Sequence, residues 1–436
     1  MKKRIMVLLL CVTMILPLVA CGGKQIDDGQ DTSANDTQTE LPDCGGDEVI
    51  TSDDIYYIEE ADVAAIDFAV RLFKEELKGE TAAYPDVPGA HAQNTLISPL
   101  SVMMALAMTA NGAEGETLSQ MEDVLGMELS QLNEFSSEYL KHLSKALQIA
   151  NSIWFREDAR VTLEDRFGQA NKNYYGADIY KRAFDQTTVD EINTWVEDKT
   201  NGMIKEALKE ISAESVMYLI NALAFEADWD VPYTERDLQD DVFTTSWGSK
   251  QDIQLMFSEE DYYFEDEKMT GVMKLYLGRE YAFVALMPKE GVSISEYAES
   301  LNGEYLHRLL LSPQEHKVHT WIPPFELEYE VEMSEILKEM GMEFAFDADY
   351  ADFSNLGSSM EENIFINSVF HKTFIEVSLE GTKAGAVSII EMANGAAMPE
   401  VERPKEVKLD RPFIYMIIDM DSKVPVFMGT LNFVES

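Results

Sequence analysis

Residues 380–398 read EGTKAGAVSIIEMANGAAM, and this stretch decides how the rest of the chain is interpreted. Counted by twos from Thr382 to Met392, one parity carries no charge, whereas the other carries Lys383 and Glu391. A strand with one buried side and one solvent-facing side shows this pattern. The Gly, Ala and Ser content, however, is poor for a strand and suits a mobile surface loop equally well. The central hypothesis is a segment that can be either loop or strand, and the alternative is an ordinary surface loop.

The composition predicts a mostly globular chain with a strongly acidic surface. Of the 436 residues, 46% are hydrophobic and 10% aromatic, which is ample for a large core. Lys and Arg number 34 against 80 Asp and Glu, for a formal net charge of −46. Such a surface repels nucleic acid and anionic lipid headgroups, so neither is expected as a direct partner.

The N-terminus predicts export. Lys2, Lys3 and Arg4 precede an apolar run from Ile5 to Ala20, the layout of a secretory signal. The run ends in Leu18-Val19-Ala20-Cys21, which resembles a bacterial lipobox. That resemblance implies a mature chain lipidated at Cys21 and anchored to the outer face of the bacterial cell membrane. The alternative is an ordinary signal peptide followed by a chance cysteine.

We expect three regions along the chain. Residues 1–20 form the signal peptide, and 21–54 form an acidic disordered tether, because large apolar side chains are almost absent there. Residues 55–436 form one domain, with regular order starting near Ala61. With Cys21 lipidated, Cys44 is the one cysteine left after the signal, so no internal disulfide is expected.

Hydrophobic periodicity predicts an α+β domain with helices mainly early and strands mainly late. The first predicted helix contains Ile66 and Leu77 and ends by Gly79, and the second is buried, starts at Ser98-Pro99 and ends at Gly112. The third begins with a capping box at Thr117 and Gln120 and runs to Leu125. Two more are predicted at Glu191–Leu208, with an interruption near Asn201-Gly202, and at Met333–Met340. The predicted strands are Ile149–Phe155, Val216–Phe225, Tyr281–Met287, Val318–Ile322, Phe365–Val377, Phe413–Ile418 and Val424–Phe433.

The sequence contains none of the common catalytic signatures. G-x-S-x-G, H-E-x-x-H, C-x-x-C, Walker A and G-x-G-x-x-G patterns are all missing. His316 and His319 precede or enter a predicted strand, where a spacing of three places them on opposite faces, so we interpret them as surface histidines. We therefore expect no enzyme, no metal and no cofactor, and a function that lies in binding or mechanics.

Several runs, in order and at matching spacing, resemble the serpin family from about Ile55 to Ser436. The runs are NTLISPLS at 94–101, GAEGET at 112–117, INTWV at 192–196, TNGMI at 200–204, LINALAF at 219–225 with Trp229 and Phe243, FHKTFIEV at 370–377 leading into Glu380-Gly381-Thr382, PFI at 412–414, and FMG at 427–429.

The resemblance implies a fold of three β-sheets with eight or nine helices and an exposed reactive-centre loop. It also implies suicide inhibition of serine and sometimes cysteine peptidases, by a molecule that we expect to be a monomer. The target peptidase cuts the loop and forms an acyl-enzyme, and the cut loop then inserts as a new strand into the main sheet. Insertion carries the peptidase along and distorts its active site.

By match to the family, the hinge of the loop is the run from Gly381 to Ala386. It comprises Gly381, Thr382, Lys383, Ala384, Gly385 and Ala386. Ser98, Ser101, Asn221 and His371 correspond to the polar cluster beneath the point where the sheet opens, and Trp229 to the tryptophan where insertion starts. The sequence departs from the family pattern at Ser378 and Leu379, where Asn and Glu are usual.

The scissile bond can be counted from either end of a loop that is longer than typical. From the hinge the count gives Gly395-Ala396, and backward from Pro404 it gives the neighbourhood of Val401-Glu402. We favour the hinge count, within the window from Met392 to Glu402, because the mechanism constrains the length of the inserted strand. Small and unbranched side chains there favour elastase-like or subtilisin-like peptidases. The alternatives are a non-inhibitory serpin and, from another class, a solute-binding lipoprotein.

Overall fold

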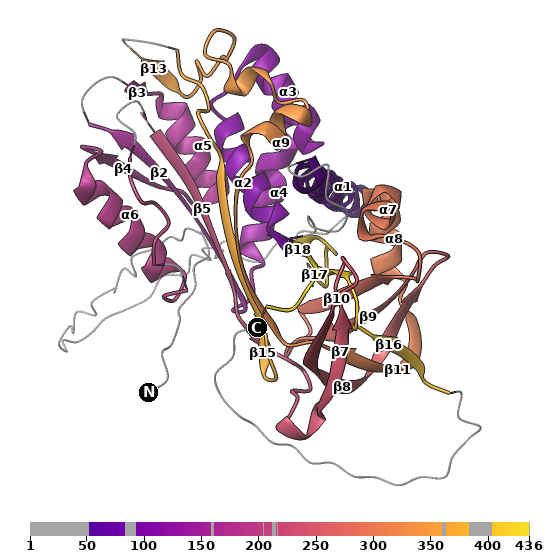
Figure 1. Ribbon diagram of the computed structural model, residues 1–436. Helices are drawn as coiled ribbons and strands as arrows, with labels where there is room; N and C mark the ends of the chain where they lie inside the picture. The colour runs from indigo at the N-terminus through magenta and orange to yellow at the C-terminus, as the bar shows by residue number, and fades with distance from the viewer. Residues whose placement is uncertain are drawn as a thin grey trace, which may run out of the picture.

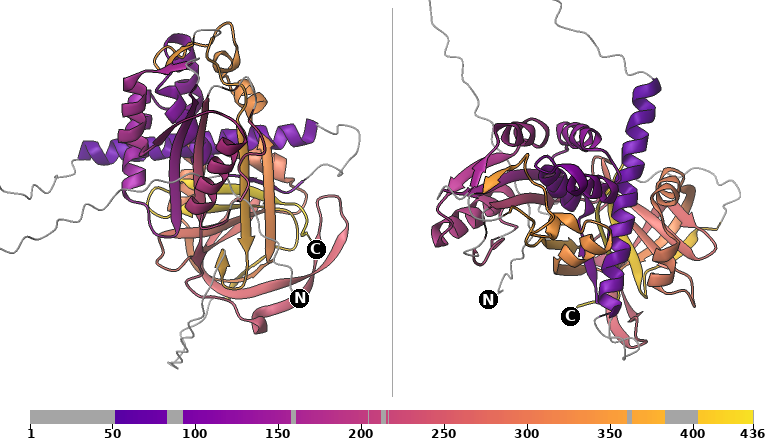
Figure 2. Two further views of the ribbon diagram at one scale, coloured as in Figure 1. Left: turned by 90° about the vertical axis from the view of Figure 1, so that its left-hand side faces the viewer. Right: turned by 90° about the horizontal axis from the view of Figure 1, so that it is seen from above.

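A computed structural model describes residues 52–82, 93–157, 161–203, 205–211, 215, 217–359, 363–382 and 403–435. Nine α-helices occur in these ranges. They are α1 Ser52–Ala82, α2 Pro99–Ala110, α3 Gly115–Leu125, α4 Leu129–Lys141, α5 Asp165–Tyr175, α6 Gln186–Lys199, α7 Ile294–Ser300, α8 Gly303–Leu311 and α9 Ser334–Glu339. Figure 2 shows α1 running across the molecule, where it contacts α8, α2 and α9.

The largest sheet of the described residues has nine strands. Its path runs β1 (Thr95–Ile97), β18 (Pro425–Leu431), β17 (Phe413–Asp419), β10 (Tyr281–Pro288), β9 (Met269–Leu275), β8 (Lys250–Glu265), β11 (Gln314–Ile322) and β16 (Lys405–Lys408), with β7 (Leu238–Thr244) paired to β8. A separate short pair joins β3 (Val161–Leu163) to β13 (Gly357–Ser359).

The remaining strands form two groups that lie side by side in Figure 1. One group has the order β4-β2-β5 and the other β12-β14-β15-β6. Their bounds are β2 Leu147–Arg156, β4 Asp178–Arg182, β5 Met217–Phe225, β6 Ala227–Asp228, β12 Phe325–Glu332, β14 Phe370–Val377 and β15 Gly381–Thr382. Only Glu226 separates β5 from β6, so the two groups share one continuous chain segment and are halves of one sheet.

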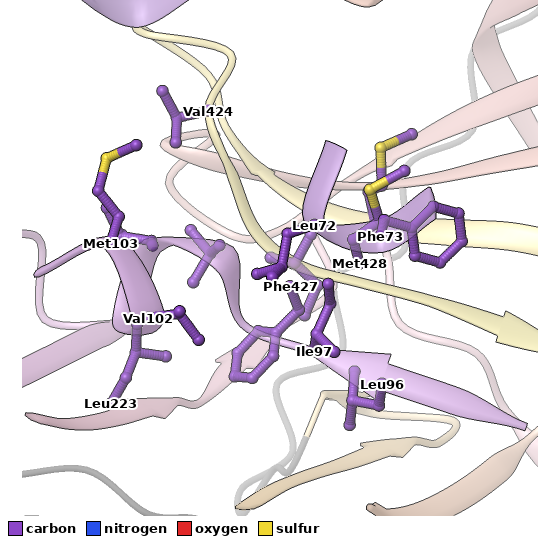
Figure 3. Packing of buried hydrophobic residues seen from close by; sticks show 14 of the residues in the cluster. Leu72, Phe73, Leu96, Ile97, Val102, Met103, Leu223, Val424, Phe427 and Met428 are labelled. Carbon is purple, nitrogen blue, oxygen red and sulfur yellow. The ribbon is translucent and has the colours of Figure 1, made fainter. Parts of the chain in front are cut away.

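The core lies between α1, α2, β1, β5 and the β17–β18 hairpin. Figure 3 shows Leu72 and Phe73 of α1 packing near Ile97, Phe427 and Met428. These side chains are almost fully buried, and each contributes roughly 1.5–3 kcal/mol by leaving water. The hairpin is buried on both faces, as its largely apolar runs predict.

The α+β fold is confirmed, whereas several predicted boundaries are wrong. Helix α1 starts at Ser52 rather than near Ala61, and runs past Gly79 to Ala82. Helix α6 ends at Lys199 instead of continuing to Leu208. Strand β14 starts at Phe370, later than predicted, because its partner β12 ends at Glu332, opposite Phe370.

The predicted capping box at Thr117 and Gln120 is also wrong. Helix α3 already begins at Gly115, so both residues lie inside it. Their side chains instead accept backbone hydrogen bonds from distant segments, Thr117 Oγ1 from Asp352 N at 2.9 Å and Gln120 Oε1 from Phe344 N at 2.8 Å. Side chains suited to a cap therefore stabilise tertiary contacts here.

Candidate functional site: the hinge and the open sheet

The start of the predicted hinge already stands inside the sheet. After β14 the chain turns back, and Ser378 N donates to Gly381 O at 2.9 Å. Thr382 then pairs with Val377 of β14 on one side and with Ala227 of β6 on the other. Gly381 and Thr382 thus form a two-residue strand, β15, between β14 and β6.

The residue types at these two positions fit that placement. A Cβ at Gly381 would lie 2.2 Å from the Ala227 carbonyl oxygen, which is far closer than real contacts allow. Only glycine lets the two backbones approach this closely. Thr382 is 3% exposed, and its Oγ1 lies 2.6 Å from the Tyr276 hydroxyl. Burial raises the pKa of Tyr276, so that hydroxyl stays neutral.

Trp229 holds the turn that precedes β15. It is 1% exposed and stacks on the Tyr276 ring, with centroids 4.5 Å apart. Its backbone N–H donates to Glu380 O at 2.9 Å, and its indole N–H donates to Ser378 O at 3.0 Å. A further backbone bond, 2.8 Å long, runs from Tyr233 N to Leu379 O. The backbone carbonyls of residues 378–380 therefore all accept hydrogen bonds from Trp229 or Tyr233.

Beyond β15 the sheet has two unpaired edges in the part of the chain that the structure describes. Strand β5 pairs with β2 alone, and β14 pairs with β12 along its length but with β15 only at Val377. At the β15 end, β6 and β14 are separated by one intervening strand, or about 9.6 Å at the usual strand spacing. Unpaired edges of this kind are templates for an added strand.

A buried polar cluster lies beneath these two edges, where helix α2 begins. Its members are Ser98 and Ser101 at the start of α2, Asn221 of β5 and His371 of β14, all at most 5% exposed. Ser98 N donates to His371 Nε2 at 2.9 Å, and Ser101 Oγ donates to Asn221 Oδ1 at 2.5 Å. Ser98 Oγ also caps α2 by accepting from Ser101 N, so the two serines connect the strands on either side.

The chemistry of this cluster depends on a neutral histidine. Burial lowers the pKa of His371 to about 3 from its ordinary 6.5, because the interior disfavours the imidazolium. Neutral Nε2 can accept the Ser98 N–H, and a protonated ring cannot. The structure thus brings together the four predicted cluster residues, and separately places Trp229 against the hinge.

Three residues that the sequence did not point to belong to the polar cluster or to the surroundings of the turn before β15. Asn151 of β2 accepts from Asn221 Nδ2 at 2.8 Å, whereas Tyr276 and Tyr233 contact the hinge turn. Asn151 is an amide within the predicted apolar strand Ile149–Phe155, and that position is the signal that could have pointed to it.

Other predicted site residues lie outside the described residues. These are Lys383, Ala384, Gly385 and Ala386 of the hinge, the Gly395-Ala396 bond with its window from Met392 to Glu402, and Cys21. Among the described residues, no group of three or more His, Cys, Asp or Glu side chains is arranged to hold a metal ion. None of the helices in the described part of the chain combines the length and apolar character needed to span a bilayer.

The described residues thus form a split sheet with a short strand, β15, at one end of the split. The comparisons with known proteins identify the class more closely. The chain matches the family Serpin (serine protease inhibitor) over residues 64–433. It therefore belongs to the serpin family.

Named relatives agree over most of their length. An uncharacterized serpin-like protein of Thermococcus kodakarensis is 30% identical over 80% of this chain and 82% of its own. A serine protease inhibitor of Cyanea capillata is 28% identical over 79% of this chain and 93% of its own. The native crystal structure of the thermophilic serpin tengpin is 41% identical, with a TM-score of 0.77 over 89% of this chain and 96% of that one.

Proposed function

We propose that this chain is a suicide inhibitor of serine peptidases that traps the acyl-enzyme by inserting its cleaved loop between β5 and β14. The placement of Gly381 and Thr382 in β15 carries the proposal, because it puts the first two residues of the new strand at the mouth of an open slot. Family membership and the serine protease inhibitor relative support the same activity.

The slot supplies the driving force for insertion. Strand β14 is eight residues long, and an inserted strand of that length bonds to an edge on each side. At about 1 kcal/mol net for each backbone hydrogen bond, the gain is on the order of 10 kcal/mol. The native state is then kept from insertion kinetically rather than by its equilibrium stability.

We propose that the reactive bond is Gly395-Ala396 and that the target is elastase-like or subtilisin-like. The support is the small and unbranched side chains on both sides of that bond, with Arg403 too distal to serve a trypsin-like pocket. A panel of elastase-like, subtilisin-like and trypsin-like peptidases, followed by mass spectrometry of the released C-terminal fragment, tests both statements. Cleavage after Arg403 would contradict them.

The trap itself is tested with Thr382→Arg. Position 382 is buried against Tyr276, so an arginine there would have to leave the slot or bury an unpaired charge at a cost of several kcal/mol. We expect wild type to form an SDS-stable complex and the cleaved wild type to melt on the order of 20 °C higher. The variant should be cut without forming the complex.

The matched control is Lys383→Arg, which places an arginine at the next position, on the opposite face of the predicted inserted strand. It should trap the peptidase like wild type. If Thr382→Arg also formed the complex, insertion from the hinge would be refuted. A wild type that is cut, gains heat resistance and releases active peptidase would instead be a non-inhibitory member of the family.

We also propose that the protein is exported and held at the outer face of a bacterial membrane by lipid on Cys21, with residues 21–54 as a tether. The lipobox-like Leu18-Val19-Ala20-Cys21 run supports this. In membrane fractions of an expressing bacterium, Cys21→Ser should release the protein from the membrane. Unchanged membrane retention of that variant would contradict the anchor.

A further inference from the structure

Strand β12 is the last strand of its group, at the end away from β6. It pairs with β14 over its whole length, from Phe325 opposite Val377 to Glu332 opposite Phe370. In the part of the chain that the structure describes, no strand pairs with its other edge. The backbone N–H and C=O groups along such an edge can pair with an added extended segment.

Every second residue of β12 is an exposed glutamate, and the residues between them are buried or half-buried. The carboxylates therefore all lie on one face of the strand. The register with β14 places four of its residues on the same face, and one of them, Phe370, is 60% exposed. We call this face the acidic edge face, and it consists of Glu326, Glu328, Glu330 and Glu332 of β12 with Glu376, Phe374, Lys372 and Phe370 of β14.

The acidic edge face carries five glutamates and one lysine. Lys372 Nζ lies 2.9 Å from Glu328 Oε1 and 3.4 Å from Glu330 Oε2, so these two carboxylates share its charge. Glu326 stands directly opposite Glu376, and neither forms an ion pair with another described residue. Like charges in this position repel, and burial together with the neighbouring glutamates raises the pKa of Glu326. A cationic group placed on this face would offset the repulsion.

A second copy of this chain does not fit as the occupant of the edge. Another β12 would bring its own row of glutamates against this one, and charged edges prevent pairing between identical sheets in this way. The occupant has to carry positive charge instead. The formal net charge of −46 attracts such a partner from a distance.

We propose that the acidic edge face binds an extended basic segment of another protein, with Lys or Arg at every second position. Side chains on one face of a strand repeat at about 6.7 Å, so the cations of an added strand follow the glutamates of β12 in register. The backbone of the segment pairs with the free edge of β12, and the exposed ring of Phe370 contacts an aliphatic stem or a guanidinium. This binding uses neither the hinge nor the polar cluster, so it is separate from peptidase inhibition.

The probe is a capped peptide of alternating arginine and valine, eight residues long to match β12. Its binding is measured by fluorescence anisotropy in about 0.15 M salt, which screens attraction at long range. One variant combines Glu326→Gln, Glu328→Gln and Glu376→Gln, which remove charge from the face and relieve the repulsion. We expect this variant to bind the peptide at least about tenfold more weakly than wild type. A wild type that does not bind the peptide would overturn the proposal.

The matched control removes the same charge elsewhere. It combines Glu116→Gln, Asp123→Asn and Glu134→Gln, which replace exposed carboxylates on α3 and α4. This variant should bind within about twofold of wild type, because single exposed charges at a distance are screened. Equal weakening in the two variants would overturn the proposal, since it would show only a general attraction of cations to an acidic chain.

Two methylated forms of the peptide test the addition of a strand. One carries N-methyl groups on every valine nitrogen and the other on every arginine nitrogen. Because the N–H groups of alternate residues point to opposite edges of a strand, one form should bind at least about tenfold more weakly and the other like the unmodified peptide. Equal binding of the two forms would overturn strand addition.

Hydrogen exchange of wild type locates the bound peptide without any substitution, so the proposal stays testable if a variant does not fold. Exchange should slow in 325–332 when the peptide binds, and it should not change in 413–419 of β17. Slower exchange in another part of the chain, with β12 unchanged, would overturn the proposal.

Discussion

Lowering the pH from about 7.5 to about 5 should weaken the native state through His371. In the fold, His371 Nε2 accepts the Ser98 N–H, and burial holds the pKa of the ring at about 3 instead of 6.5. Between these two pKa values the unfolded chain binds a proton that the native chain does not. Stability therefore falls as the pH drops through 6.5, and the loss grows until about pH 3.

The size of the loss follows from the pKa difference. Each pH unit below 6.5 costs about 1.4 kcal/mol, so native stability at pH 5 is lower by about 2 kcal/mol from this residue alone. Below about pH 3, where the ring is protonated in the fold as well, protonation also ends the hydrogen bond that links β14 to the start of α2. The two strands that flank the slot then lose one of the connections beneath them.

Urea unfolding at both pH values, followed by tryptophan fluorescence, measures this loss for wild type and for His371→Gln. Glutamine keeps an acceptor for Ser98 N–H and does not titrate. Carboxylates contribute to the pH dependence of both proteins, so the difference between the two proteins isolates His371. That difference should be about 2 kcal/mol. Equal pH dependence, or an NMR titration of His371 near pH 6.5, would refute the reasoning.

Three further substitutions have defined outcomes. Gly381→Ala should cause most encounters with a target peptidase to end in simple cleavage, because its methyl group would lie 2.2 Å from the carbonyl oxygen of Ala227 in β6. The measurement is a rise in the stoichiometry of inhibition, and an unchanged stoichiometry would contradict the pairing of β15. Ser101→Ala removes the donor to Asn221 Oδ1 and should lower the free energy of unfolding in urea by about 1–3 kcal/mol. A loss below the measurement error would show that this hydrogen bond does not stabilise the fold. Trp229→Phe keeps an aromatic ring at this position and loses the hydrogen bond to Ser378 O. We expect the free energy of unfolding in urea to fall by about 1 kcal/mol. A far larger loss would mean that packing of the indole dominates.

Much of the fold was predictable where a local pattern records burial directly. The Ser98-Pro99 start of α2 is read from one hydroxyl and one proline, and the β17–β18 hairpin from two largely apolar runs. The prediction failed where side chains serve distant segments. Thr117 imitates a capping residue and instead accepts a hydrogen bond from Asp352 N.

The long strand β8 shows why other elements escaped prediction. Lys250–Glu265 mixes charged and apolar residues because β7, β9 and β11 pair with different parts of it, so no single period describes the strand. Strand β12 is different, because it was missed although its sequence alternates regularly, with a glutamate at every second position of an edge strand.

The sequence by itself determined the α+β class and the family, and it predicted the residues of the hinge and the polar cluster, because each of these is written in runs of neighbouring residues. Only the tertiary structure decided that Thr382 stands between two strands, that β5 and β14 have unpaired edges, and that Lys274 is buried beside Trp229. Strand pairing joins residues that lie far apart in the chain, and burial is a property of what those residues meet. The spacing of neighbours does not show which strands pair, and it gives no reason to expect that this one lysine of an acidic chain is buried.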